Sequence, residues 1–182
     1  GNAPFVVSVV GAGGKTSLIR QMAEEGKNHG LKVLVLTTTH MFAPKRFGCL
    51  DAPPEKVGEM LARDGIAAVG HLEETGKISF QGWEYYRRVT SFAELVLVEA
   101  DGSKRLPVKV PKEGEPVVPE DTALLPCVAG LSAFGRRAEE VCFRLKQAKA
   151  LLGADFETIE LPVMKQLMEL GYLRPWREKI PA

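Results

Sequence analysis

Residues 5–16 read Phe5-Val6-Val7-Ser8-Val9-Val10-Gly11-Ala12-Gly13-Gly14-Lys15-Thr16, and this stretch decides the fold class of the chain. The run from Phe5 to Val10 is apolar and β-branched, which is typical of a strand buried on both faces in a parallel sheet. Glycines end the run, and residues 16–28 then carry apolar side chains at the spacing of an amphipathic helix. Residues 32–37 form a second β-rich run, which completes a strand, helix and strand of the length of a parallel crossover. The sequence therefore predicts an α/β fold with a mainly parallel sheet.

The rest of the chain gives further patterns of the same kinds. A buried strand over residues 94–99 ends in acidic residues, and four prolines within residues 106–119 predict an extended segment or loop. The other predicted elements are helices at 55–63 and 83–89, a hairpin of 66–70 with 78–80 across 74–77, a strand at 124–128, helices at 138–152 and 162–170, and an irregular segment at 172–176.

Length and composition favour one domain over residues 1–182, with a hairpin insertion around residues 66–82. The 24 basic and 23 acidic residues give a net charge of +1, so no overall charge attracts nucleic acid or an anionic membrane. No apolar run approaches the roughly 18 residues of a membrane span, and we expect no membrane partner. The three cysteines, Cys49, Cys127 and Cys142, are too widely spaced to indicate a disulfide framework or a zinc site, which favours a cytoplasmic protein.

The glycine-rich segment has the residues that a phosphate-binding loop needs. Glycines let main-chain N–H groups approach a polyanion, and the start of the following helix favours negative charge. Lys15 is expected to reach the β- and γ-phosphates, and the Thr16 hydroxyl to bind Mg²⁺. The expected nucleotide-binding residues are Gly11, Ala12, Gly13, Gly14, Lys15, Thr16 and Ser17. This setting predicts a P-loop NTPase-like three-layer α/β/α fold, with ATP or GTP as the nucleotide.

Two other interpretations of the loop stay open. The full G-x-x-x-x-G-K-[ST] pattern places its first glycine at position 9, where this chain has Val9. The segment is therefore also compatible with a simple glycine-rich turn between a strand and a helix. A dinucleotide-binding turn fits less well, because it requires a glycine near Thr16 or Ser17 and an acid at the end of the second strand.

The second strand ends in Thr37-Thr38-Thr39-His40, at the edge of the sheet where ligands of parallel sheets bind. Threonine hydroxyls there can hold a phosphate or a metal-bound water. His40 can accept a proton, bind a metal or contact a second substrate. Strand propensity alone explains Thr37, so the candidate residues are Thr38, Thr39 and His40.

Glu99 and Asp101 end the strand over residues 94–99 in the way that acids end the metal-binding strand of triphosphatases. A carboxylate there would hold Mg²⁺ opposite the Thr16 hydroxyl. The spacing does not decide between Glu99 and Asp101, and Asp101-Gly102 is also an ordinary turn signal.

Cations follow the acidic strand end. Lys104, Arg105 and Lys109 lie in the proline-containing segment, where they either bind a second anionic group or are solvated loop charges. The same two interpretations apply to Arg136 and Arg137.

Taken together, these segments resemble the YqeC family, which is described as accessory proteins for selenium-dependent molybdenum hydroxylases. The resemblance is carried by residues 9–16, 37–41, 98–104, 106–109, 115–119 and 128–131. It implies a phosphate-loop fold and a role in maturing a selenium-containing molybdenum cofactor, with a molybdenum hydroxylase or its maturation proteins as partners.

The sequence supports three hypotheses about activity, since a triphosphate clamp serves all of them. The first is a Mg²⁺-dependent NTPase or NTP-dependent enzyme with Lys15, Asp101 and His40 as catalytic residues. The second is a nucleotide-gated delivery switch with slow turnover. The third is a small-molecule kinase whose acceptor is held by cations such as Lys104, Lys109 or Arg136.

Overall fold

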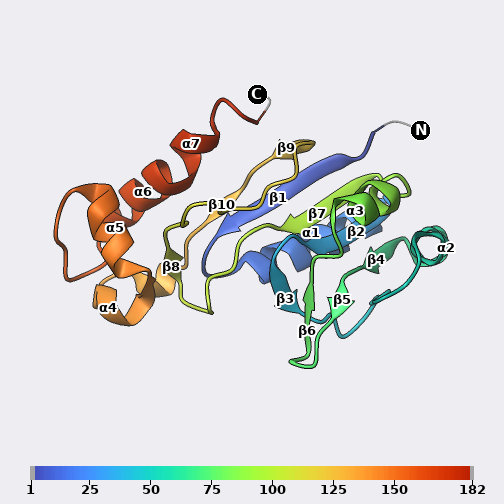
Figure 1. Cartoon of the computed structure of the whole chain (residues 1–182), viewed down its shortest axis with the longest axis horizontal. Helices are drawn as coiled ribbons and strands as arrows, with labels where there is room; N and C mark the ends of the chain where they lie inside the picture. The colour runs from blue at the N-terminus through green and yellow to red at the C-terminus, as the bar shows by residue number, and fades with distance from the viewer. Residues whose placement is uncertain (1–2, 181–182) are drawn as a thin grey trace.

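A parallel sheet lies at the centre of the computed structural model, which describes residues 3–180 (Figure 1). The strand order is β10-β1-β7-β2-β4, with β9 also paired to β1, and every one of these pairings is parallel. The strands are β1 (Phe5–Gly11), β2 (Val33–Thr37), β4 (Ile66–Ala68), β7 (Leu95–Glu99), β9 (Thr122–Leu124) and β10 (Cys127–Val128). Strand β7 lies between β1 and β2, so the acidic strand end is next to the tip of β2 and to residues 11–16, the predicted phosphate-binding segment that we call the phosphate loop.

Helices cover both faces of this sheet, which confirms the predicted three-layer α/β/α fold. Helix α1 (Lys15–Asn28) packs Ile19 and Ala23 on one face, against Val7 and Val9 of β1. Alternate residues of β1 point to the opposite face, which is covered by α2 (Pro54–Asp64) and α3 (Trp83–Thr90). The near-continuous apolar run of β1 therefore serves two cores at once.

A small antiparallel sheet flanks the central one and corrects the predicted hairpin. Its strands are β3 (His40–Phe42), β6 (Lys77–Ser79) and β5 (His71–Leu72), so the hairpin across residues 74–76 joins β5 to β6. The prediction that residues 66–70 form its first arm is wrong, because β4 pairs in parallel with β2. All three residues of β4 are buried and contribute to both cores, which suits a strand covered on two faces.

The C-terminal part forms a third core beside the sheet (Figure 1). It contains β8 (Val108–Lys109), η1 (Leu131–Ala133), α4 (Ala138–Val141), β11 (Cys142–Phe143), α5 (Leu145–Leu152), α6 (Leu161–Met168), η2 (Glu169–Leu173) and α7 (Arg174–Trp176). Strands β8 and β11 pair in parallel. Within residues 3–180, no helix has the length and apolar character needed to cross a bilayer.

In the second half of the chain, two predictions are confirmed only in part and one is wrong. Residues 138–152 are two helices, because β11 interrupts them and Arg144 has a left-handed φ of 66°. Residues 172–176 continue a helical segment instead of being irregular, since Tyr172 is held in the core. The strand predicted at 124–128 is two short strands, β9 and β10, separated at Leu125 and Pro126.

Candidate functional site

The phosphate loop joins β1 to α1 and lies against the backbone that follows β10. Gly11 has φ +89°, and a Cβ built there would lie 2.2 Å from the Val128 carbonyl oxygen. Gly13 has φ +73°, and its Cβ would lie 2.6 Å from the Cα of Gly130. Both positions therefore require glycine for backbone angle and for space. The Ala12 amide donates to the Val128 carbonyl at 2.7 Å, which fixes the loop to that segment.

Lys15 is the first residue of α1, and its side chain bends back over the loop. The residue is 5% exposed, and its Nζ donates to the Gly11 carbonyl at 2.8 Å. Burial lowers the pKa of Lys15, although the nearby carboxylates of Glu99 and Asp101 oppose this effect. Among residues 3–180, no carboxylate forms an ion pair with it. The ammonium group is therefore enclosed but not neutralised by direct contact.

Thr16 and Glu99 meet at the mouth of the loop. The Thr16 hydroxyl donates to Oε2 of Glu99 at 2.8 Å. Burial raises the pKa of Glu99, while the hydrogen bond from Thr16 and the charge of Lys15 act in the opposite direction. A hydroxyl and a carboxylate oxygen thus face the same cleft, from α1 and from the end of β7.

Asp101 takes a different position, behind the loop. It is fully buried, its Oδ1 is paired with the ammonium of Lys109, and its Oδ2 accepts the Tyr172 hydroxyl at 2.7 Å. The Gly11 amide also donates to Oδ2, at 3.2 Å. Asp101 therefore supports the phosphate loop from inside the protein and does not line the cleft.

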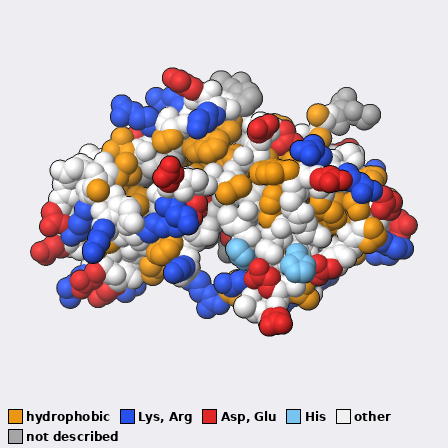
Figure 2. All heavy atoms as spheres, viewed as in Figure 1, with side chains coloured by type: hydrophobic (Ala, Val, Ile, Leu, Met, Phe, Trp, Pro, Cys, Tyr) orange, Lys and Arg blue, Asp and Glu red, His pale blue; other side chains and the backbone are white. Residues whose placement is uncertain are grey.

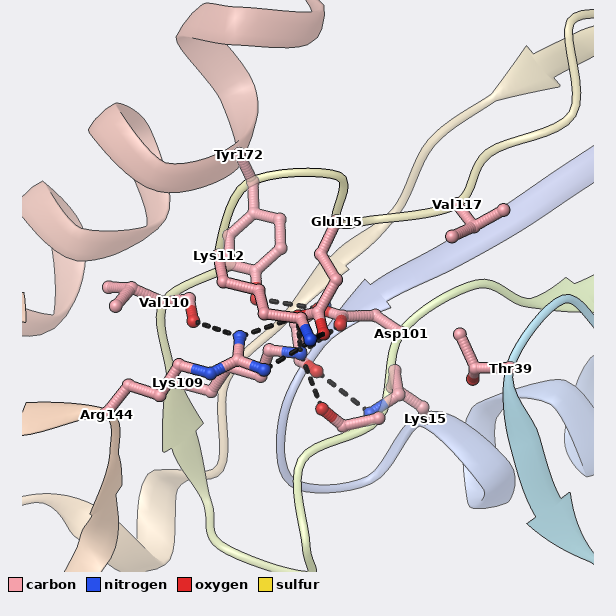
Figure 3. A network of polar contacts seen from close by, with 12 residues as sticks. Lys15, Thr39, Asp101, Lys109, Val110, Lys112, Glu115, Val117, Arg144 and Tyr172 are labelled. Atoms are coloured by element: carbon pink, nitrogen blue, oxygen red, sulfur yellow. Dashed lines mark hydrogen bonds and ion pairs between the residues drawn. The ribbon is translucent and has the colours of Figure 1, made fainter. Parts of the chain in front are cut away.

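An ionic network extends from Asp101 toward the C-terminal part (Figure 3). Its members Asp101, Lys109 and Tyr172 are buried, whereas Glu115 and Arg144 are half-buried and also line the cleft. Lys109 donates to the Gly102 carbonyl at 2.5 Å and to Oε2 of Glu115 at 2.8 Å. Arg144 donates to both oxygens of Glu115, at 2.6 and 2.9 Å, and to the Val110 carbonyl at 3.2 Å. We refer to Asp101, Lys109, Glu115, Arg144 and Tyr172 as the buried network.

The two cations of the buried network lower the pKa of Glu115. Partial burial alone would raise this pKa, but the hydrogen bonds from Arg144 and Lys109 and their positive charges outweigh it and hold the pKa at about 2. Glu115 is therefore a carboxylate bound on both sides by cations.

The tip of β2 approaches the cleft from the side opposite β1. The Thr37 hydroxyl donates to the Glu99 carbonyl at 2.8 Å and accepts from the Thr39 amide at 3.0 Å. The Thr38 hydroxyl donates to the Val117 carbonyl at 2.5 Å, so it serves the structure of the tip. Thr39 and His40 face the cleft, where Nε2 of His40 lies 3.1 Å from Oε1 of Glu73. Figure 3 shows Thr39 apart from the buried network.

These elements enclose a cleft of about 1380 Å³. Eleven residues that the sequence predicted for a site line it: Gly13, Gly14, Lys15, Thr16, Ser17, Thr38, Thr39, His40, Glu99, Lys104 and Arg105. Four others, Gly11, Ala12, Asp101 and Lys109, lie behind its wall. Arg136 and Arg137 also lie outside the lining, where they pair with Glu140 and Glu139.

Sequence reasoning missed three members of the buried network: Glu115, Arg144 and Tyr172. Tyr172 is 71 positions from its partner Asp101, and Arg144 is 29 positions from Glu115. In the sequence, Glu115 is distinguished only by the family resemblance of residues 115–119. No local pattern links residues so far apart in the sequence. The one available signal is Asp101 at the end of a predicted buried strand, since a buried carboxylate requires cations or hydrogen-bond donors beside it.

Burial disfavours the thiolate form of two of the three cysteines. Burial raises the pKa of Cys127 to about 12, with Asp101 adding to the effect, and burial raises that of Cys142 to about 11. Both are free thiols, as is Cys49.

The chemistry of the cleft fits Mg²⁺ together with a polyphosphate. Magnesium prefers oxygen ligands and is usually bound by one or two carboxylates plus substrate phosphates and water. Thr16 and Glu99 supply such oxygens. Within residues 3–180, no group of three or more His, Cys, Asp or Glu side chains is placed to hold a metal ion.

The fold and the loop define the class of protein. The chain is an α/β protein with a parallel sheet, and a glycine-rich loop that ends in a lysine joins its first strand to its first helix. The family described as YqeC protein matches residues 7–146, and the chain belongs to this family. The chain is 35% identical over 150 residues to a protein of Escherichia coli (strain K12) called uncharacterized protein YqeC. The alignment covers 74% of this chain and 55% of that protein, so the chain spans about half the length of this relative.

Proposed function

We propose that this chain binds a Mg²⁺–nucleoside triphosphate at the phosphate loop and hydrolyses it or transfers its γ-phosphoryl group. One observation carries the proposal. A buried lysine, a threonine hydroxyl and a carboxylate from separate elements converge on one cleft, at the carboxyl ends of parallel strands.

Each residue has a distinct task in this proposal. Lys15 exchanges its hydrogen bond with the Gly11 carbonyl for phosphate oxygens, and amides at the start of α1 bind further oxygens. Burial disfavours the charged form of Lys15, and a bound phosphate group would favour that form by placing negative charge beside the ammonium. The main contributions to catalysis are positioning and stabilisation of charge, as in phosphoryl transfer generally.

Between the two candidate acids, we assign the metal-binding role to Glu99. Glu99 faces the cleft and contacts the Thr16 hydroxyl, whereas both Asp101 oxygens are engaged inside the protein. Bound Mg²⁺ would neutralise part of the phosphate charge. Asp101 instead positions the loop through the Gly11 amide.

Thr39 and His40 are assigned to the far end of the triphosphate. Both line the cleft, and the Thr39 backbone is tied to Thr37 and through it to β7. His40 has a side chain that is 59% exposed, which leaves it accessible to a γ-phosphate or to a second substrate.

Membership of the YqeC family supports a finer proposal about the pathway. We propose that the nucleotide-dependent step serves the maturation of a selenium-dependent molybdenum hydroxylase, in contact with that enzyme or its maturation proteins. The test is complementation: in cells lacking the gene, hydroxylase activity should return with the parent chain and not with Lys15→Ala.

Isothermal titration calorimetry with Mg²⁺–ATP and Mg²⁺–GTP tests nucleotide binding directly. We expect saturable binding of at least one nucleotide, weakened by about one to two orders of magnitude in Lys15→Ala because a hydrogen-bonded charge is lost. Glu99→Gln should lower the dependence of binding on Mg²⁺. Lys146→Ala, a change at an exposed lysine of α5 outside the cleft, is the matched control. If neither nucleotide binds, or if Lys15→Ala binds as well as the parent, the proposal fails.

The size of the cleft favours a second candidate function, a small-molecule phosphotransferase. Ligand pockets usually have volumes of about 300–1,000 Å³, and this cleft has about 1380 Å³. An acceptor could therefore lie beside the nucleotide. Phosphorylated product formed from ATP and a candidate acceptor, in place of free phosphate alone, would distinguish transfer from hydrolysis.

A further inference from the structure

The wall of the cleft formed by the loop after β7 carries cations without acidic partners. Lys104 and Arg105 come from this loop, and Lys77 comes from β6. Among residues 3–180, none of the three forms an ion pair with a carboxylate. They contrast with Arg144 and Lys112, which lie near Glu115 in the same cleft.

Aromatic rings hold these cations in place. The guanidinium of Arg105 lies 4.7 Å and the ammonium of Lys77 lies 5.8 Å from the ring centre of Phe42. The ammonium of Lys104 lies 5.2 Å from the ring centre of Phe143. A ring positions a cation without neutralising its charge, so the positive charge remains available to a ligand. Figure 2 shows Lys and Arg side chains between the C-terminal helical part and the small sheet.

The backbone of this loop provides a second, independent observation. Lys104 and Arg105 have φ of +49° and +66°, so two consecutive basic residues adopt the left-handed region. Residues other than glycine rarely adopt this backbone conformation, and those that do cluster at ligand-binding sites. Arg144, which also lines the cleft, has φ of +66°. Three of the five non-glycine residues described with positive φ are therefore basic residues of one cleft.

We propose that Lys104, Arg105 and Lys77 form a second anion site, which binds a phosphate-type group of a small molecule other than the nucleotide. We call these three residues the cationic wall. The proposal rests on the nucleotide site proposed above and names the chemical class of its second ligand. A cleft of about 1380 Å³ has room for both molecules. Phosphate matches the wall because adjacent Lys and Arg donors suit a dianionic oxygen cluster.

The test separates the two sites by saturating one of them. The protein is loaded with Mg²⁺ and a non-hydrolysable ATP analogue, and phenyl phosphate is then titrated by calorimetry. We expect saturable binding that weakens by about tenfold or more in the double variant Lys104→Ala, Arg105→Ala, since two charge-assisted contacts are removed. Lys146→Ala should bind phenyl phosphate as the parent does.

Nucleotide affinity provides the discriminating measurement. If the double variant loses affinity for the ATP analogue by the same factor, the wall holds the nucleotide's own phosphates and the proposal is overturned. It is also overturned if loaded parent protein does not bind phenyl phosphate, or if the double variant binds it equally well.

A third variant distinguishes failure of this proposal from failure of the nucleotide assignment. Lys15→Met removes the lysine of the phosphate loop and leaves the cationic wall unchanged. Phenyl phosphate should still bind this variant without nucleotide, and binding should still depend on Lys104 and Arg105. If the parent binds no nucleotide but phenyl phosphate binding still depends on Lys104 and Arg105, the nucleotide assignment fails and the anion site is supported. If phenyl phosphate binding does not depend on these two residues, the cationic wall is not an anion site.

Discussion

The phosphate loop and the buried network each contain a buried lysine, and the two lysines are paired in opposite ways. Lys109, 3% exposed, contacts Asp101, Glu115 and the Gly102 carbonyl. Lys15, 5% exposed, contacts the Gly11 carbonyl. A charge surrounded by acceptors contributes to structure, whereas under the proposed function an enclosed charge that contacts a carbonyl is available to an anion from outside. On that proposal, the pairing of a buried charge separates the supporting part of this site from the binding part.

The largest effect on stability is expected for Lys109→Met. Removing this ammonium leaves Asp101 buried without its cation, while Glu115 keeps Arg144 and the more distant, exposed Lys112. Breaking a buried ion pair by removing one partner costs about 3–5 kcal/mol. Urea unfolding followed by circular dichroism measures this loss, with Lys15→Met as the matched control. An equal loss in the two variants would contradict the distinction between the two lysines.

A smaller effect, about 2–3 kcal/mol at neutral pH, is expected for Glu115→Gln, because hydrogen bonds to charged groups contribute about 1.5–3 kcal/mol each. The pKa of Glu115 in the folded state, about 2, is lower than its ordinary value of 4.5. Its contribution is therefore fully present above about pH 4.5 and is lost as the pH falls toward 2.

The pH dependence is measured by comparing urea midpoints of parent and Glu115→Gln at about pH 7 and about pH 3. We expect the difference in stability to shrink at the lower pH. Glu113→Gln, at an exposed position in the same segment, should show little difference at either pH. A difference for Glu115→Gln that stays constant with pH would show that its carboxylate is not held by Lys109 and Arg144.

The two regions also differ in how far the sequence predicts them. The phosphate loop is contiguous, so strand β1, the glycines and Lys15 could all be located from one segment, and the family and the three-layer fold are confirmed. The placement of Thr16 opposite Glu99 follows from strands whose carboxyl ends meet at one edge. The roles of these residues in binding stay predictions.

The buried network could not be predicted because its contacts join distant positions. The sequence predicts an irregular segment at Tyr172, yet this residue is among the most buried and donates to Asp101. Residues 138–152 have helical periodicity, which did not indicate the left-handed turn at Arg144. That turn begins α5 where Arg144 reaches Glu115, so a tertiary contact outweighs local propensity.

A still smaller effect is expected for Tyr172→Phe, which removes one hydroxyl from the network. The Asp101 oxygen that loses this donor remains buried, and the cost should be about 1–2 kcal/mol. Tyr85→Phe is the control, because that hydroxyl donates at a similar distance, 2.8 Å, to the neutral carbonyl of Ala52 at a half-buried position. Urea unfolding should show a greater loss for Tyr172→Phe. Equal losses would indicate that the charge of Asp101 adds nothing to the hydrogen bond.

The smallest effect on stability, within about 1 kcal/mol of the parent or slightly stabilising, is expected for Lys15→Met. Burial lowers the pKa of Lys15, which means that folding disfavours its charged form, and methionine has no charge to desolvate. The same variant should bind Mg²⁺–nucleotide about one to two orders of magnitude more weakly than the parent, so that stability and binding change independently. Calorimetric titration and urea unfolding on one protein preparation test both parts. A lysine that serves to bind an anion is expected to lower stability while that anion is absent. If Lys15→Met instead lowered the free energy of unfolding by several kcal/mol, Lys15 would be a structural partner of Glu99 and Asp101.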